Sequence, residues 1–161
     1  MIRKGFKEDL PAVLNLIKEL AEYEKESNEV VVTLSDMERD GFGENPLFKF
    51  FVAEVGETIV GMALYFVKYS TWKGKCIYLD DIIVTQVYRR KGIGKLLFEA
   101  VVKVTVDLRA RRLEWQVLDW NKPAIEFYKK YDAKFMNTWL SCRLTHEQLR
   151  EYSNQLKIQK N

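Results

Sequence analysis

A change of hydrophobic period around a glycine turn most restricts the folds open to this chain. Residues 76–84 form an apolar run that only Asp80 and Asp81 interrupt, which is typical of a buried strand. Residues 92–109 instead repeat apolar side chains at helical spacing. A strand that turns directly into an amphipathic helix is a building unit of domains in which helices pack on a sheet. The turn between them is basic and reads Arg89-Arg90-Lys91-Gly92-Ile93-Gly94-Lys95.

The remaining segments alternate between helical and strand periods. Capping-box spacing of Ser35 with Glu38, and of Thr145 with Gln148, marks the starts of two helices. The pattern predicts helices over 9–25, from Ser35 to about 41, from 121, and from 145 to about 156. It predicts strands over 2–6, 48–55, 58–68 and 113–118, and one or two final hairpin strands over 134–144. This order predicts an α/β fold with a mixed sheet and helices on both faces.

The chain has the length of one ordinary domain. Its 161 residues contain no repeat, linker or low-complexity stretch, so we expect a single domain over residues 1–161. The first residues lack the apolar core of a signal peptide, and no apolar run approaches the ~20 residues that cross a bilayer. We therefore expect a cytoplasmic protein that makes no membrane contact, with Cys76 and Cys142 reduced.

Charge and histidine content narrow the possible chemistry. The formal charge is +3, from 26 Lys and Arg against 23 Asp and Glu, which argues against nucleic acid as a partner. The single histidine, His146, makes a histidine-based catalytic triad a poor expectation. Two cysteines 66 positions apart fit no common zinc spacing, so we expect no metal. Any catalytic acid or base should be Asp, Glu, Tyr or water.

The basic turn has the features of a phosphate-binding loop. The first turn of a helix carries unpaired N–H groups and a positive dipole end, and glycines let the backbone approach an anion. A Walker loop is excluded because Arg89 stands at its first glycine and Leu96 at its Ser/Thr. A Rossmann loop is excluded because Leu97 stands at its third glycine. A plain basic turn between strand and helix remains as the alternative.

The spacing Arg89-x-x-Gly92-x-Gly94 resembles the pyrophosphate-binding signature of the GCN5-related N-acetyltransferase (GNAT) family. The resemblance implies the GNAT fold, an α/β fold with a mixed, mostly antiparallel central sheet, and acetyl-CoA as co-substrate. It implies that Arg89 and the run from Arg90 through Lys91, Gly92, Ile93 and Gly94 to Lys95 line the pyrophosphate site. It further implies that the backbone of Ile82, Ile83 and Val84 pairs with the pantetheine arm.

Several separated segments resemble one subfamily more closely. Residues 40–46, 69–74, 77–82, 117–121 and 127–129 are similar to the diamine/polyamine (spermidine/spermine) N-acetyltransferases, and closest to the thialysine Nε-acetyltransferase branch. The resemblance implies a homodimer that acetylates a primary amine of a small molecule. Ser70 stands where spermidine/spermine enzymes carry an aspartate, which removes a carboxylate for a distal ammonium. Arg90 and Asp132 also depart from the usual glycines.

The resemblance assigns roles to single residues. It implies Tyr128 as the general acid and Asp80 as an acceptor-side carboxylate that binds or deprotonates the amine. Asp80 is one methylene shorter than the usual glutamate. The resemblance also implies that Asn121 and Ala124 contact the pantetheine arm. The residues that it implies around the acceptor amine, together with Asp80, are Tyr23, Glu24 and Trp72.

Other interpretations remain open from the sequence alone. Without the resemblance, Asp80 would be a strand-end or ion-pair residue, and Tyr128 a core tyrosine. A non-catalytic module that senses acyl-CoA would share the glycine loop, but it would not require Tyr128 and Asp80. A nucleic-acid binder using residues 89–91 and 109–112 is disfavoured by the balanced charge and the lack of a recognition motif.

Overall fold

A five-stranded sheet forms the centre of the first of two compact units. The computed structural model describes residues 1–158, and the first unit ends at Gln116. The sheet has the order β1-β2-β3-β4-β5, with the bounds Ile2–Lys4, Lys49–Val55, Thr58–Ser70, Gly74–Val84 and Leu113–Glu114. The first four strands pair antiparallel, and β5 lies parallel to β4. The predicted mixed, mostly antiparallel sheet is confirmed.

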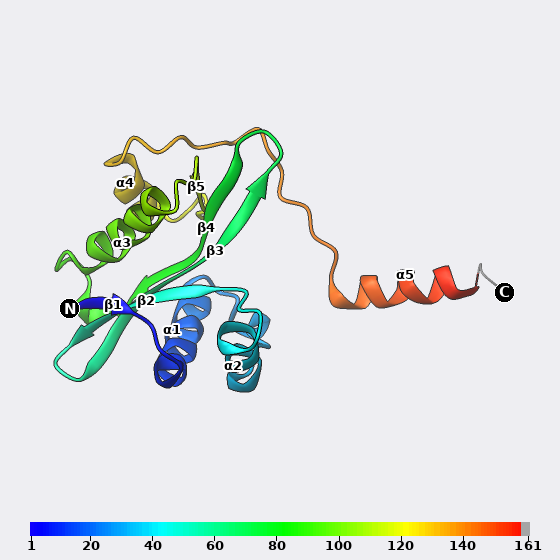
Figure 1. The fold of residues 1–161 in the computed structure, drawn as a ribbon, viewed down its shortest axis with the longest axis horizontal. Helices are drawn as coiled ribbons and strands as arrows, with labels where there is room; N and C mark the ends of the chain where they lie inside the picture. Colours follow the sequence, from blue (N-terminus) through cyan, green and yellow to red (C-terminus); the bar gives the residue numbers. More distant parts are fainter. Residues whose placement is uncertain (159–161) are drawn as a thin grey trace. The chain divides into compact units, whose positions relative to one another are not determined.

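Helices cover both faces of this sheet (Figure 1). Helices α1 (Leu10–Tyr23) and α2 (Leu34–Phe42) pack on one face, where Leu10 and Met37 join Leu64 of β3 in the buried core. Helix α3 (Ile93–Asp107) covers the other face and buries Leu97 and Val101. Short 3₁₀ turns occur at Lys7–Asp9, Ser27–Glu29 and Gln86–Tyr88. The predicted helices over 9–25 and 92–109 are confirmed.

The predicted cap of α2 is wrong by two residues. The helix begins at Leu34, and Thr33 rather than Ser35 is its N-cap. The Asp36 N–H donates to Thr33 Oγ1 at 3.2 Å, and the Thr33 N–H donates to Asp36 Oδ2 at 3.0 Å. Aspartate therefore completes the capping box in place of the expected glutamate. Its shorter side chain reaches the cap backbone just as Glu or Gln does in the usual motif.

The second unit begins at Val117 and contains α4 (Lys122–Lys129) and α5 (His146–Ile158). Asn121 caps α4 as predicted, because its Oδ1 accepts from the Ala124 N–H at 3.3 Å. The capping box of α5 is also confirmed: the Thr145 N–H donates to Gln148 Oε1 at 2.8 Å, and the Gln148 N–H donates to Thr145 Oγ1. None of the described helices is long and apolar enough to cross a membrane.

Two strand predictions are wrong. No strand forms over 134–144 within the described residues. Met136, Leu140, Cys142 and Leu144 would share one face of an extended chain, but no described strand pairs with this segment, and a strand needs a neighbour for its backbone hydrogen bonds. The expected strand over 113–118 shrinks to two residues. Its pairing with β4 ends at Glu114, opposite Tyr78, just before an irregularity in β4.

That irregularity is a β-bulge at Asp80. Leu64 of β3 pairs with Asp81 and Tyr65 pairs with Leu79, so Asp80 has no partner across the ladder. Neighbouring side chains of a regular strand point to opposite faces, whereas an extra residue breaks this alternation. The bulge thus lets Asp80 and Asp81 line the same cleft on the face that α1 and α2 cover. It also leaves the edge of β4 after Tyr78 without a strand partner among residues 1–158.

Candidate active site

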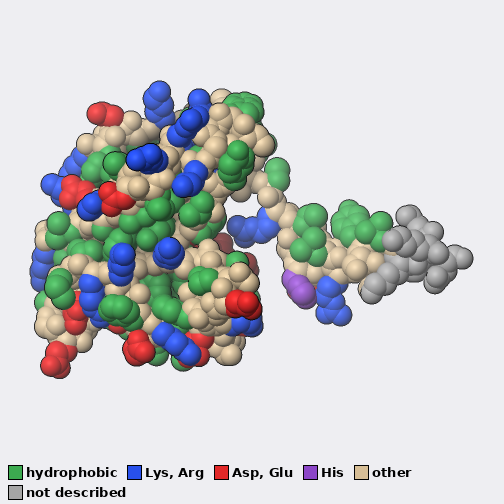
Figure 2. All heavy atoms as spheres, viewed as in Figure 1, with side chains coloured by type: hydrophobic (Ala, Val, Ile, Leu, Met, Phe, Trp, Pro, Cys, Tyr) green, Lys and Arg blue, Asp and Glu red, His purple; other side chains and the backbone are tan. Residues whose placement is uncertain are grey.

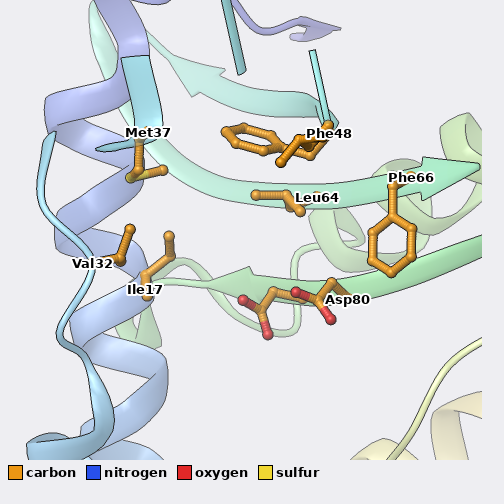
Figure 3. Close-up of a pocket in the computed structure, with 9 residues that line it drawn as sticks. Ile17, Val32, Met37, Phe48, Leu64, Phe66 and Asp80 are labelled. Atoms are coloured by element: carbon orange, nitrogen blue, oxygen red, sulfur yellow. The ribbon is translucent and has the colours of Figure 1, made fainter. Parts of the chain in front are cut away.

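A cleft of about 530 Å³ lies in the first unit, on the sheet face that α1 and α2 cover. Figure 3 shows the Asp80 carboxylate pointing into it. Asp80 and Asp81 are the only charged residues that line it among the described residues. The rest of its wall is apolar, from α1, α2, β3 and the segments beside them: Ile17, Val32, Met37, Leu47, Phe48, Leu64 and Phe66. Such a cleft is suited to a small molecule with one polar end.

The two aspartates differ in burial and in pKa. Asp81 is half-buried, and burial raises its pKa to about 6, with the charges of Asp80 and then Glu24 adding to the effect. Asp80 is more exposed, and partial shielding of its carboxyl raises its pKa as well. Neither carboxylate accepts a hydrogen bond from another described residue. With its pKa raised to about 6, Asp81 is mainly ionised at pH 7.4 and takes up a proton as the pH falls through about 6.

Glu24 adds a third carboxylate, close enough for its charge to act on Asp81. It follows the last residue of α1, Tyr23, and is half-buried. Burial raises its pKa, and the charge of Glu26 contributes further. Because the charge of Glu24 also raises the pKa of Asp81, the two groups act on each other. The three carboxylates Glu24, Asp80 and Asp81 concentrate negative charge that attracts a cation.

Arg89 makes its contacts inside the protein. Its Nε donates to the Val84 carbonyl at 2.7 Å, and its guanidinium lies 5.0 Å from the centre of the Tyr23 ring. A terminal nitrogen lies 4.0 Å from Glu19, which also accepts from Thr85 Oγ1 at 2.9 Å. Arg89 and Glu19 thus tie the end of β4 to α1. Sequence reasoning missed Glu19, although it stands one helical turn before Tyr23.

The glycine turn places the N-terminus of α3 next to the end of β4. Gly92 is the N-cap residue with a φ of +82°, and no side chain caps the helix. A Cβ on Gly92 would meet nothing within 4 Å, so the left-handed backbone rather than crowding requires glycine there. Arg90, Lys91 and Lys95 are exposed around the turn. The open N–H groups, the helix dipole and these cations fit a pyrophosphate.

The structure places the other predicted residues in separate parts of the chain. Tyr128 of α4 is buried, with 5% of its surface exposed, and burial raises its pKa to about 12. Asn121 and Ala124 lie at the start of α4, in the same unit. Trp72 is 78% exposed at the turn between β3 and β4. Trp72 does not line the cleft, and the strand rises about 20 Å from Gly74 to Asp80.

Comparison with known proteins identifies the family. Residues 11–132 match the sequence model of the Acetyltransferase (GNAT) family. The chain belongs to the GNAT family. A thialysine N-epsilon-acetyltransferase of Bos taurus is 41% identical to this GNAT enzyme over 162 residues, which cover 94% of the chain and 95% of the relative. An L-ornithine N5-acetyltransferase of Arabidopsis thaliana is 38% identical over 125 residues, covering 77% of the chain and 52% of the relative.

Solved structures share the GNAT fold at lower identity. An integron cassette protein of V. cholerae superposes with a TM-score of 0.78 at 22% identity, covering 95% of this chain and 96% of its own. An aminoglycoside acetyltransferase from a soil metagenome superposes with a TM-score of 0.75 at 21% identity, covering 90% and 96%. These likenesses support the fold alone. Family membership implies acetyl-CoA as the acetyl donor.

Replacing Gly94 with alanine separates the loop's role in binding from its role in folding. A Cβ on Gly94 would meet only Val84, at an ordinary 3.8 Å, and alanine favours a helix over glycine by about 1 kcal/mol. We expect Gly94→Ala to keep or raise the free energy of unfolding while weakening CoA binding about tenfold, because the methyl group obstructs the backbone surface offered to the pyrophosphate.

Calorimetric titration with CoA and thermal unfolding measure the two effects of Gly94→Ala. Gly56→Ala serves as the control, because this turn residue between β2 and β3 has a φ of +62° and open space around it. We expect Gly56→Ala to destabilise the fold by about 1 kcal/mol and to leave the Kd for CoA unchanged. An unchanged Kd in Gly94→Ala would contradict the predicted loop function.

Proposed function

We propose that this GNAT enzyme transfers the acetyl group of acetyl-CoA directly to the primary amine of a small molecule. The observation that carries the proposal is the pair Asp80 and Asp81, the charged residues among the described lining of an otherwise apolar cleft. Relatives named for acetylation of thialysine and ornithine support a small amine as the acceptor. A thialysine-like amino acid, a diamine and a polyamine are the acceptor classes to be tested.

The carboxylate pair suits the first requirement of this reaction, a neutral amine. A lysine-like amine has a pKa of about 10.4, so at pH 7.4 only about one molecule in a thousand is neutral, which costs roughly 4 kcal/mol. We assign Asp81 as the base, directly or through water, because it is ionised yet has a pKa raised to about 6. Asp80 keeps the ammonium in the cleft and holds the pKa of Asp81 up.

The donor side draws on the glycine turn and on Tyr128. Backbone N–H groups of Gly92 to Lys95 would hold the pyrophosphate, and acetyl-CoA supplies an acetyl group already activated as a thioester. We assign Tyr128 as the general acid, whose Oη–H donates a proton to the leaving sulfur. Burial raises its pKa to about 12, so the hydroxyl stays protonated throughout the neutral range.

We also propose that the enzyme works as a homodimer. The second unit exposes several large apolar side chains, and contiguous apolar patches often mark interaction surfaces. Trp139 is 69% exposed and Leu140 88%, and Leu149 and Tyr152 are exposed on one side of α5. Figure 2 shows hydrophobic side chains on α5, whereas acidic and basic side chains are interspersed over the first unit. A second copy of the chain would cover the apolar residues.

Release of CoA from acetyl-CoA with a panel of single amines tests the proposed reaction. The panel contains thialysine, lysine, ornithine, putrescine, spermidine and spermine. We expect turnover that requires both acetyl-CoA and an amine, with a product that carries one added acetyl group by mass spectrometry. Tight CoA binding without turnover on any amine would instead indicate a module that senses the acyl donor.

A further inference from the structure

We infer that Glu19 of α1 is a positioning residue for the donor loop, residues 85–92, which joins β4 to α3. Glu19 holds the first residues of this loop against α1, so that the glycine turn meets the pyrophosphate of acetyl-CoA in a fixed conformation. The inference rests on the proposed donor binding at the glycine turn, and it gives a role to a residue outside that turn.

Both carboxylate oxygens of Glu19 accept hydrogen bonds from the start of the donor loop. Thr85 Oγ1 donates to Glu19 Oε2 at 2.9 Å, and the Gln86 N–H donates to Glu19 Oε1 at 3.1 Å. The two donors are adjacent in the chain and lie 66 and 67 positions from Glu19. Hydrogen bonds to an ionised carboxylate are stronger than neutral ones. Two such bonds fix the orientation of the loop as well as its position.

Hydrogen bonds within the segment extend this restraint towards the glycine turn. The Tyr88 N–H donates to the Thr85 carbonyl at 2.9 Å, which closes the short 3₁₀ turn. Arg89 Nε then returns to the Val84 carbonyl at 2.7 Å. The segment from the end of β4 to Arg89 is therefore one hydrogen-bonded unit, and Glu19 anchors its start. This unit ends three residues before Gly92, the N-cap of α3.

The conformation of the donor loop matters because backbone N–H groups bind an anion only when they point at it together. Beyond Arg89 the backbone is left-handed at Arg90, with a φ of +61°, and again at Gly92, with a φ of +82°. A loop that is already ordered avoids the entropy cost of ordering on binding. Loss of the Glu19 contact should therefore weaken donor binding even though the cations and N–H groups of the turn are unchanged.

A purely structural role for Glu19, that of holding α1 on the sheet, makes a different prediction. Helix α1 also lines the acceptor cleft, and Figure 3 shows Ile17 of this helix among the lining side chains. A displaced α1 would disturb the binding of the amine as well as that of acetyl-CoA. A displaced donor loop would disturb the binding of acetyl-CoA alone. The KM for the amine therefore distinguishes the two roles.

Glu19→Ala tests the inference through the two KM values. We expect the Kd for CoA and the KM for acetyl-CoA to rise about tenfold, and the KM for an amine substrate to change less than about twofold. Glu19→Gln should keep all three within about threefold of wild type, because its amide can accept from the Gln86 N–H and donate to Thr85 Oγ1. Glu22→Gln is the matched control, because Glu22 is an exposed carboxylate on the same helix and has no assigned role. It should change none of the three constants.

Thr85→Val tests the same contact from the loop side and decides the matter if Glu19→Ala does not fold. It removes one of the two hydrogen bonds at nearly constant volume, so we expect the Kd for CoA to rise about threefold. A wild-type Kd in Glu19→Ala or in Thr85→Val would overturn the inference. An equal rise of both KM values in Glu19→Ala would also overturn it and leave the proposed function intact. A wild-type protein that does not bind CoA would overturn both.

Discussion

Asp81→Asn is expected to lower kcat/KM about 100-fold or more while making the protein more stable at neutral pH. The amide cannot accept the proton of the incoming ammonium, and loss of a general base costs typically about 10²–10⁴-fold. The same change removes a carboxylate that is half-buried and lies near the charges of Asp80 and Glu24. The free energy of unfolding should therefore rise by about 2 kcal/mol at pH 7.

The pH dependence of both effects follows from the raised pKa of Asp81. The folded protein holds a proton on Asp81 up to about pH 6, whereas the unfolded chain releases it near 3.8. Ionisation of Asp81 therefore lowers the free energy of unfolding of the wild type progressively as pH rises from about 4 to 6. The greater stability of Asp81→Asn over the wild type should vanish below about pH 4. Wild-type kcat/KM should rise with pH through about 6 as Asp81 becomes ionised.

Asp80→Asn provides the comparison for Asp81→Asn. It removes the neighbouring negative charge, which lowers the pKa of Asp81 and moves the acidic limb of the kcat/KM profile to lower pH. Urea unfolding across pH and steady-state rates with one amine measure these shifts. Full activity in Asp81→Asn would show that Asp81 is not the base. If the acidic limb of the kcat/KM profile lies at the same pH in wild type and Asp80→Asn, the charge of Asp80 does not raise the pKa of Asp81.

Tyr128→Phe is expected to lower kcat about 100-fold and to leave the Kd for CoA unchanged. The aromatic ring keeps its buried place on α4, so the fold should lose only about 1 kcal/mol with the hydroxyl. What disappears is the proton donor to the departing sulfur. Tyr69→Phe is the matched control, because Tyr69 is 78% exposed on β3 and has no assigned role.

Rapid-quench measurement of acetyl transfer, together with CoA titration, distinguishes the possible results for Tyr128. A loss of kcat with unchanged CoA binding supports the general acid. An equal loss of both would make Tyr128 a residue that shapes the donor site, and wild-type turnover would exclude a chemical role. Wild-type kcat and CoA binding in Tyr69→Phe would show that a loss in Tyr128→Phe is not a general effect of removing a tyrosine hydroxyl.

The fold could be predicted from the sequence where apolar side chains follow one period over a long segment. The helices over 10–23 and 93–107 and the long strands β3 and β4 have such patterns, and they form as expected. Local chemistry was less decisive. Thr33 and Ser35 are both good caps, and only the bond between Thr33 and Asp36 decides where α2 begins. The segment over 134–144 was misassigned because alternating apolar positions do not by themselves make a strand, which also needs a neighbouring strand to pair with.

The candidate site was predictable only in part. The glycine turn was found because its spacing is a local property of the chain. The importance of Asp81 was missed because it depends on burial and on Glu24, which lies far away in the sequence. The bulge that brings Asp81 beside Asp80 depends on pairing with β3, which neither residue reveals by itself. The contacts of Arg89 with Val84 and Tyr23 could not be predicted either, because they depend on the tertiary structure.

The bulge in β4 also bears on how the activity of such an enzyme could change in evolution. Deleting the single codon for Asp80 would leave Leu79 next to Asp81, opposite Tyr65 and Leu64, which are already neighbours in β3. The pairing of β3 with β4 would then be regular and would keep every existing pair. One of the two carboxylates that line the cleft would be lost. Asp81, the proposed base, would remain, but without the neighbouring charge that helps to raise its pKa and to hold the ammonium. An acetyltransferase with weakened acceptor binding and a shifted pH profile is thus one in-frame deletion away from this sequence.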